Sequence, residues 1–132
     1  MRKKVVLLID DKLEIREILK KSLQDNFNVI DVRSVREAVD ILNNPRKFPC
    51  IDIIATDDEM SSIRGVYLIR NLGASQLHRH IPTILYTQKK YGICIMTLKN
   101  GCKGWMYPEF KNIDKKNISI VADKINELAS AE

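Results

Sequence analysis

Residues 53–60 read IIATDDEM, an apolar run that ends in three consecutive acids. A continuous apolar run of this kind is typical of a strand buried on both faces. Such a strand delivers the residues that follow it to the carboxyl edge of its sheet, where α/β proteins bind ligands. Residues 5–11, VVLLIDD, repeat the pattern near the N-terminus. Two buried strands that each end in acids are the main functional signal in this sequence.

Length and composition indicate one globular domain, which we expect to span residues 1–132. The hydrophobic fraction is 45%, and 22 basic residues against 17 acidic ones give a net charge of +5. The lysines are scattered rather than clustered, which favours solvated surface over a nucleic-acid site. No apolar run is long enough to cross a membrane, and three cysteines without metal-ligand spacing favour buried, reduced thiols. We therefore expect a cytoplasmic protein.

Strand and helix patterns alternate along the whole chain. Strands are predicted at 5–9, 28–32, 51–56, 81–86 and 104–107, and helices at 13–23, 35–42, 66–72 and 91–99, with a last helix whose apolar face is Ile118, Val121, Ala122, Ile125 and Leu128. Five β-α repeats imply a parallel sheet with helices on both faces. The prediction is an α/β fold: a flavodoxin-like (βα)5 three-layer sandwich with a parallel five-stranded sheet of order 2-1-3-4-5.

In this order the first and third strands are neighbours, so Asp10, Asp11 and Asp57 should meet at one edge of the sheet. Carboxylates that share a pocket repel each other unless a cation joins them, and oxygen ligands suit Mg²⁺. An Asp carboxylate can also attack phosphorus, and Thr87, after the fourth strand, is placed to hydrogen-bond a phosphoryl oxygen. The alternative is that the acids only cap helices. Two acidic pairs on adjacent strands, with a Thr on the next, disfavour it.

Together these motifs resemble the receiver domain of two-component response regulators, over essentially the full chain. The matching segments are Asp10-Asp11 followed by Arg16, Asp57 followed by Met60 and Gly65, residues 81–87 (IPTILYT), and residues 101–105 (GCKGW). No single motif is decisive, but their order and spacing together are specific.

The resemblance implies roles for the acids. Asp57 would accept a phosphoryl group from a histidine kinase or a phosphotransfer protein. Asp11 and Asp57 would bind Mg²⁺ directly, Asp10 through water, and Glu59 through its backbone carbonyl.

The resemblance also implies a switch. Thr87 and Trp105 would couple phosphorylation to a surface formed by the helix at 91–99, the strand at 104–107 and the last helix. That surface would bind a partner or form a homodimer, and nucleic acid would be contacted only through an effector domain that this sequence does not contain.

The sequence departs from the family at one electrostatic position. Tyr107 stands before Pro108 where the family carries a near-invariant Lys that pairs with the phosphoryl group. Tyr cannot supply a positive charge, and Lys89, Lys103 and Lys111 are the candidate replacements. This departure raises the alternative of a degenerate receiver, an interaction module that works without phosphorylation.

Smaller departures surround the mouth of the expected site. Gln88 follows Thr87 where the family usually has a small residue, and Glu59 and Lys89 are placed to pair across the mouth. Neither an Asp-x-Asp motif after the first strand nor a Gly-rich phosphate loop is present, which disfavours an aspartyl-phosphate phosphatase and a nucleotide-binding protein. We therefore expect a signalling switch and not a turnover enzyme.

Overall fold

The structure is a computed structural model, which describes residues 2–89, 92–103, 111–113 and 117–130. The described elements are the strands β1 (Lys4–Ile9), β2 (Phe27–Val32), β3 (Ile53–Asp57), β4 (Thr83–Lys89), β5 (Gly92–Leu98) and β6 (Lys111–Ile113), and the helices α1 (Leu13–Leu23), α2 (Val35–Leu42), α3 (Gly65–Ala74) and α4 (Ser119–Ser130). The sheet order is β2-β1-β3-β4-β5-β6, so the predicted order 2-1-3-4-5 is confirmed. The sheet is parallel from β2 to β4, as predicted, but β5 pairs antiparallel with β4 and with a sixth strand, β6.

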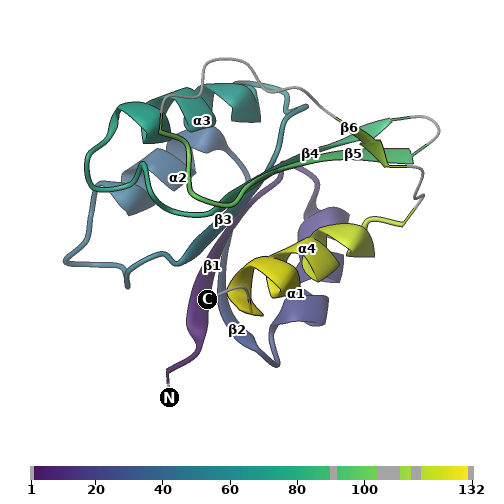
Figure 1. Cartoon of the computed structure of the whole chain (residues 1–132), viewed down its shortest axis with the longest axis horizontal. Helices are drawn as coiled ribbons and strands as arrows, with labels where there is room; N and C mark the ends of the chain where they lie inside the picture. The colour runs from purple at the N-terminus through teal and green to yellow at the C-terminus, as the bar shows by residue number, and fades with distance from the viewer. Residues whose placement is uncertain (1, 90–91, 104–110, 114–116, 131–132) are drawn as a thin grey trace.

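Helices cover both faces of the sheet, as the sequence predicts. Figure 1 shows α1 and α4 on one face and α2 and α3 on the other. Alternate residues of the strands serve the two cores: Leu8 and Ala55 pack with α1 and α4, whereas Leu7 and Ile54 pack with α2 and α3. This alternation explains why the strands read as continuous apolar runs, since neither face meets water.

The helix starts follow local sequence signals. Ser34, the N-cap of α2, accepts a hydrogen bond from the backbone N–H of Glu37 at 3.2 Å. The Glu37 carboxylate in turn accepts from the backbone N–H of Arg33 at 3.1 Å. These two bonds satisfy donors that a helix N-terminus otherwise leaves unpaired.

The predicted helix over 91–99 is wrong. Residues 92–98 form β5, which runs antiparallel to β4, with Thr87 opposite Cys94. Ile93 and Ile95 enter the core under α1 and α4, while Met96 and Leu98 enter the core under α2 and α3. The segment is apolar on both faces of a two-residue period, so a strand buries residues 93–96 and Leu98 and leaves Thr97 exposed, whereas a helix would expose one apolar side.

Two further predictions need comment. The predicted strand at 104–107 lies outside the described residues, and the fifth place in the sheet belongs to β5 instead. The expectation of buried thiols holds for Cys94 and Cys102, but Cys50 is exposed.

In the part of the chain that the structure describes, no helix is both long and apolar enough to span a bilayer.

Candidate functional site

Three carboxylates meet at the carboxyl edge of the sheet. Adjacent parallel strands β1 and β3 end side by side, with Ile9 opposite Thr56. The residues that follow bring Asp10, Asp11 and Asp57 together, with one oxygen of each within 4.8 Å of the others. The structure therefore joins the three acids that the sequence analysis placed at one edge.

Asp57 is a buried carboxylate with few donors. Its Oδ1 accepts from the backbone N–H of Glu59 at 3.3 Å, and its Oδ2 lies 3.6 Å from the ammonium Nζ of Lys12. Burial, and then the nearby charge of Asp10, raise the pKa of Asp57 to about 7. The ionised form that would attack phosphorus is thus destabilised until a cation joins it.

Asp10 is held by two donors from different elements. The hydroxyl of Tyr86, on β4, donates to its Oδ2 at 2.7 Å, and the backbone N–H of Lys12 donates to its Oδ1 at 2.9 Å. Burial raises the pKa of Asp10, and these two hydrogen bonds oppose that rise. Burial and the neighbouring carboxylates also raise the pKa of Tyr86, so its hydroxyl stays a donor.

Replacing Tyr86 by Phe should destabilise the protein by about 1–3 kcal/mol at pH 8, because it leaves a buried Asp10 oxygen without its donor. Urea unfolding measures the change. Tyr67→Phe is the matched control, since Tyr67 is 48% exposed. Equal unfolding free energies for the two variants would show that the Tyr86 hydroxyl contributes nothing.

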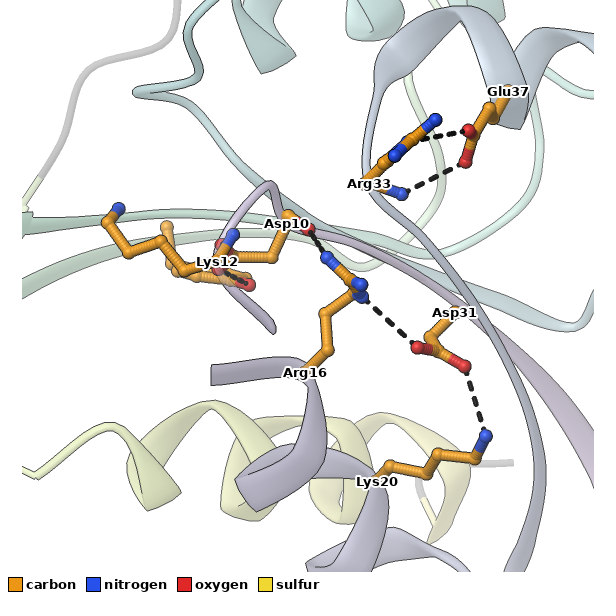
Figure 2. A network of polar contacts seen from close by, with 8 residues as sticks. Asp10, Lys12, Arg16, Lys20, Asp31, Arg33 and Glu37 are labelled. Carbon is orange, nitrogen blue, oxygen red and sulfur yellow. Dashed lines mark hydrogen bonds and ion pairs between the residues drawn. The ribbon is translucent and has the colours of Figure 1, made fainter. Parts of the chain in front are cut away.

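Arg16 fixes the end of β1 from below the site (Figure 2). Its Nη1 donates to the backbone carbonyl of Asp10 at 2.7 Å, and its Nε donates to Asp31 Oδ2 at 3.1 Å. Lys20 donates to the other oxygen of Asp31 at 3.1 Å. Burial alone would raise the pKa of Asp31, but the hydrogen bonds and charges of Lys20 and Arg16 outweigh it and lower that pKa. Arg16 thus links α1, β1 and β2 through one guanidinium.

Asp58 has a structural environment that differs from that of Asp57. Its Oδ1 accepts from the backbone N–H of Val66 at 3.1 Å, and its Oδ2 accepts from Arg64 at 2.6 Å. A carboxylate in this place caps the first turn of α3. Both Asp58 oxygens are therefore engaged away from the acid cluster, which leaves Asp57 as the acid of this run that faces it.

The predicted pairing of Glu59 with Lys89 is present, with 2.7 Å between Oε1 and Nζ. The hydrogen bond from Lys89 lowers the pKa of Glu59, and both side chains are 55% exposed. Thr87 lies beside this pair and is buried. Its Oγ1 has no hydrogen-bond partner of ordinary length among the described residues, although it lies near enough to Glu59 to help lower that pKa.

The residues at this edge fit a hard divalent cation. All the side-chain ligands that the structure brings together are carboxylate oxygens, the donors that Mg²⁺ prefers. Asp11 Oδ2 accepts from the backbone N–H of Ser61 at 3.0 Å, but Asp11 Oδ1 is buried without a partner in the described chain. Buried polar atoms normally have a partner, and a bound cation would supply one to this oxygen.

Two site predictions lie outside the described residues: Trp105 as the switch aromatic and Tyr107 in place of the family's Lys. Of the lysines suggested as replacements, Lys89 pairs with Glu59, Lys103 is exposed, and the side chain of Lys111 is not described. Lys12, which the sequence analysis missed, is the lysine among the described residues that forms an ion pair with Asp57. Its position directly after Asp10 and Asp11 could have indicated that it lies at the acid cluster.

Comparison with known proteins agrees with this arrangement of fold and acids. A family model described as the response regulator receiver domain matches residues 6–118. This chain belongs to that family. The predicted resemblance is confirmed.

Individual relatives of this receiver domain are distant. It is 25% identical to the chemotaxis protein CheY of Pseudomonas aeruginosa, over 92% of this chain and 98% of that protein. It is 31% identical to the 3',5'-cyclic-nucleotide phosphodiesterase regA of Dictyostelium discoideum and 23% identical to the two-component response regulator-like APRR1 of Arabidopsis thaliana, over 91% and 89% of this chain. The receiver spans only 15% and 19% of those two longer proteins.

Solved structures share the fold of this receiver. CheY4 of Vibrio cholerae matches with a TM-score of 0.60 at 23% identity, over 67% of this chain and 72% of that one. The Mn(2+)-bound form of response regulator Rcp1 matches with a TM-score of 0.60 at 18% identity, over 66% and 67% of the two chains. About a third of this chain therefore falls outside each match.

Proposed function

We propose that this receiver is a signalling switch that accepts a phosphoryl group on Asp57. The observation that carries the proposal is the meeting of Asp10, Asp11 and Asp57 at the edge of the sheet, with Thr87 on the neighbouring strand. The donor would be a histidine kinase or a phosphotransfer protein, and the domain would not be a turnover enzyme.

The chemistry is a transfer between two nucleophiles. A new P–O bond forms with a carboxylate oxygen of Asp57 while the bond from phosphorus to the donor's leaving group breaks, and the electron pair departs with that group. Asp11 and Asp57, with Asp10 through water and the Glu59 carbonyl, would hold Mg²⁺, which would offset the negative charge on the oxygens of the transferring phosphoryl group. The Thr87 hydroxyl would donate to a phosphoryl oxygen, which would give its buried Oγ1 a partner.

Phosphorylation would change the conformation of β4 and β5 and not that of a helix at 91–99, because residues 92–98 form a strand. Thr87 lies opposite Cys94 in the antiparallel ladder. A movement of Thr87 toward the phosphoryl group would therefore displace β5 directly. We propose that the β4–β5 region presents the partner surface, in place of the surface that included a helix at 91–99.

Incubation with Mg²⁺ and a small acyl phosphate tests the proposal. The wild-type protein should gain the mass of one phosphoryl group, in an adduct that is stable in acid and labile in base, and Asp57→Asn should gain none. Intact-mass spectrometry measures both.

Asp58→Asn is the matched control for this assay, because Asp58 caps α3, so its adduct should persist. If wild-type protein gains no mass under conditions that label an ordinary receiver, phosphorylation is ruled out. The degenerate receiver, which Tyr107 in the place of a lysine favours, would then be the function.

A further inference from the structure

Lys12 joins two members of the acid cluster through two different groups. Its backbone N–H donates to Asp10 Oδ1 at 2.9 Å, and its side-chain Nζ lies 3.6 Å from Asp57 Oδ2. The backbone is thus anchored to one carboxylate while the ammonium reaches the other. The side chain is 45% exposed, so the ammonium keeps freedom to move at the mouth of the site.

Among the described residues, three other basic side chains near the site pair with other groups. Arg64 pairs with Asp58 at 2.6 Å, and Lys89 pairs with Glu59 at 2.7 Å. Arg16 binds the backbone carbonyl of Asp10 and the carboxylate of Asp31. Within residues 2–89, 92–103 and 117–130, Lys12 is the basic side chain that forms an ion pair with Asp57.

We infer that Lys12 is the counter-charge for the phosphoryl group on Asp57, a task that Tyr107 cannot perform. The inference rests on the proposed function. Phosphoryl transfer replaces one carboxylate charge by a group that carries about two, so the attraction of an ammonium a few ångströms away increases. The Lys12 ammonium can move to the phosphoryl oxygens, because its aliphatic side chain is flexible and its Nζ already lies 3.6 Å from the Asp57 carboxylate.

Besides Mg²⁺, the step needs no reactant other than the donor. The P–O bond to Asp57 forms as the bond to the leaving carboxylate of the acyl phosphate breaks, and that carboxylate departs with the electron pair. Lys12 stays protonated throughout and contributes electrostatic stabilisation only.

In the same geometry, the Lys12 ammonium competes with a bound metal ion for the carboxylate of Asp57. The ammonium and a divalent cation are both attracted to the carboxylate of Asp57, and two cations at neighbouring positions repel each other. Removing the Lys12 charge should therefore strengthen Mg²⁺ binding while it weakens phosphoryl transfer. A residue that only held the fold of the site would change both properties in the same direction.

The experiment compares Lys12→Gln and Lys12→Arg with Lys21→Gln, a control that removes an equal charge from an exposed position on α1. Two properties are measured: the rate of adduct formation from a small acyl phosphate at saturating Mg²⁺, and the Mg²⁺ dissociation constant by calorimetry without phosphodonor. Lys12→Gln should form the adduct about ten-fold more slowly and bind Mg²⁺ about three-fold more tightly. Lys12→Arg and Lys21→Gln should stay within about two-fold of wild type.

The outcomes separate the inference from the proposed function. Equal adduct rates for wild type and Lys12→Gln would overturn the role of Lys12 and leave phosphorylation standing. A slower rate together with weaker Mg²⁺ binding would also overturn it, since Lys12 would then only support the site. Absence of an adduct in every variant, wild type included, would overturn the proposed function and the inference together.

Discussion

Replacing Asp57 by Asn should stabilise the metal-free protein by about 2–4 kcal/mol at pH 8 and by less than about 1 kcal/mol at pH 4. The reason is that the pKa of Asp57 is raised to about 7 in the folded protein, by burial first and by the charge of Asp10 second. Above that pH the wild type must hold an ionised carboxylate in a buried, acidic site, and Asn removes that charge without changing its size.

The direction follows from proton binding. Between the unfolded pKa of about 3.9 and the folded pKa, native Asp57 keeps its proton while the unfolded chain loses it. The folded state binds more protons, so stability falls as the pH rises through this range. Below it both states are protonated, and the penalty vanishes.

Urea unfolding in a metal chelator at several pH values between 4 and 8 measures the effect. Asp25→Asn is the matched control, since it makes the same substitution at an exposed position. Added Mg²⁺ should stabilise the wild type at pH 8 more than it stabilises Asp57→Asn. A pH-independent difference between wild type and Asp57→Asn would contradict the buried-charge explanation.

Replacing Gly65 by Ala should destabilise the protein by about 3 kcal/mol or more, a large effect for one methyl group. A Cβ at this position would lie far inside van der Waals contact with the backbone oxygen of Asp57, and 3.0 Å from both Leu85 Cδ1 and Thr56 Oγ1. The backbone oxygen cannot move aside as a flexible side chain would, because it belongs to β3. The start of α3 would have to withdraw from the end of that strand.

The same urea unfolding assay, at one pH, tests Gly65→Ala. Ser62→Ala is the control, because Ser62 is exposed in the same loop and should lose under about 0.5 kcal/mol. If the unfolding free energy of Gly65→Ala lies within about 1 kcal/mol of the wild-type value, the start of α3 can shift away from β3 at little cost. The close approach of Gly65 to the backbone oxygen of Asp57 would then not be a constraint.

Most of the fold could be predicted because its signals are local. The runs at 5–9 and 53–55 are continuously apolar, the helices at 13–23 and 35–42 carry apolar residues at helical spacing, and Ser34 caps the second of these helices. The segment 92–98 was misread because seven apolar-rich residues fit either a short helix or a strand buried on both faces. Its two-residue alternation of Ile93 and Ile95 against Met96 and Leu98 decides for the strand, and tertiary burial reveals that alternation.

The sequence predicts the carboxylates of the site but not the side chains that donate hydrogen bonds or positive charge to them. Asp10, Asp11 and Asp57 follow strand ends, and strand order alone brings them together. Lys12 and Tyr86 contribute through side-chain direction and reach, which spacing in the sequence does not fix. The pairing of Glu59 with Lys89 could be anticipated because Glu59 lies two residues past Asp57 and Lys89 two residues past Thr87, and Asp57 and Thr87 belong to neighbouring strands.

The antiparallel pairing of β4 with β5 also bears on how the chain folds. Paired residues in this hairpin are separated in sequence by 3 positions at Lys89 and Gly92 and by 15 at Thr83 and Leu98. Val6 and Ile53, which pair β1 with β3, are 47 positions apart. Because the entropic cost of closing a loop grows with its length, pairing β4 with β5 costs less entropy than pairing β1 with β3. The strand that carries Thr87 can thus gain a partner before the acid-bearing strands β1 and β3 have met.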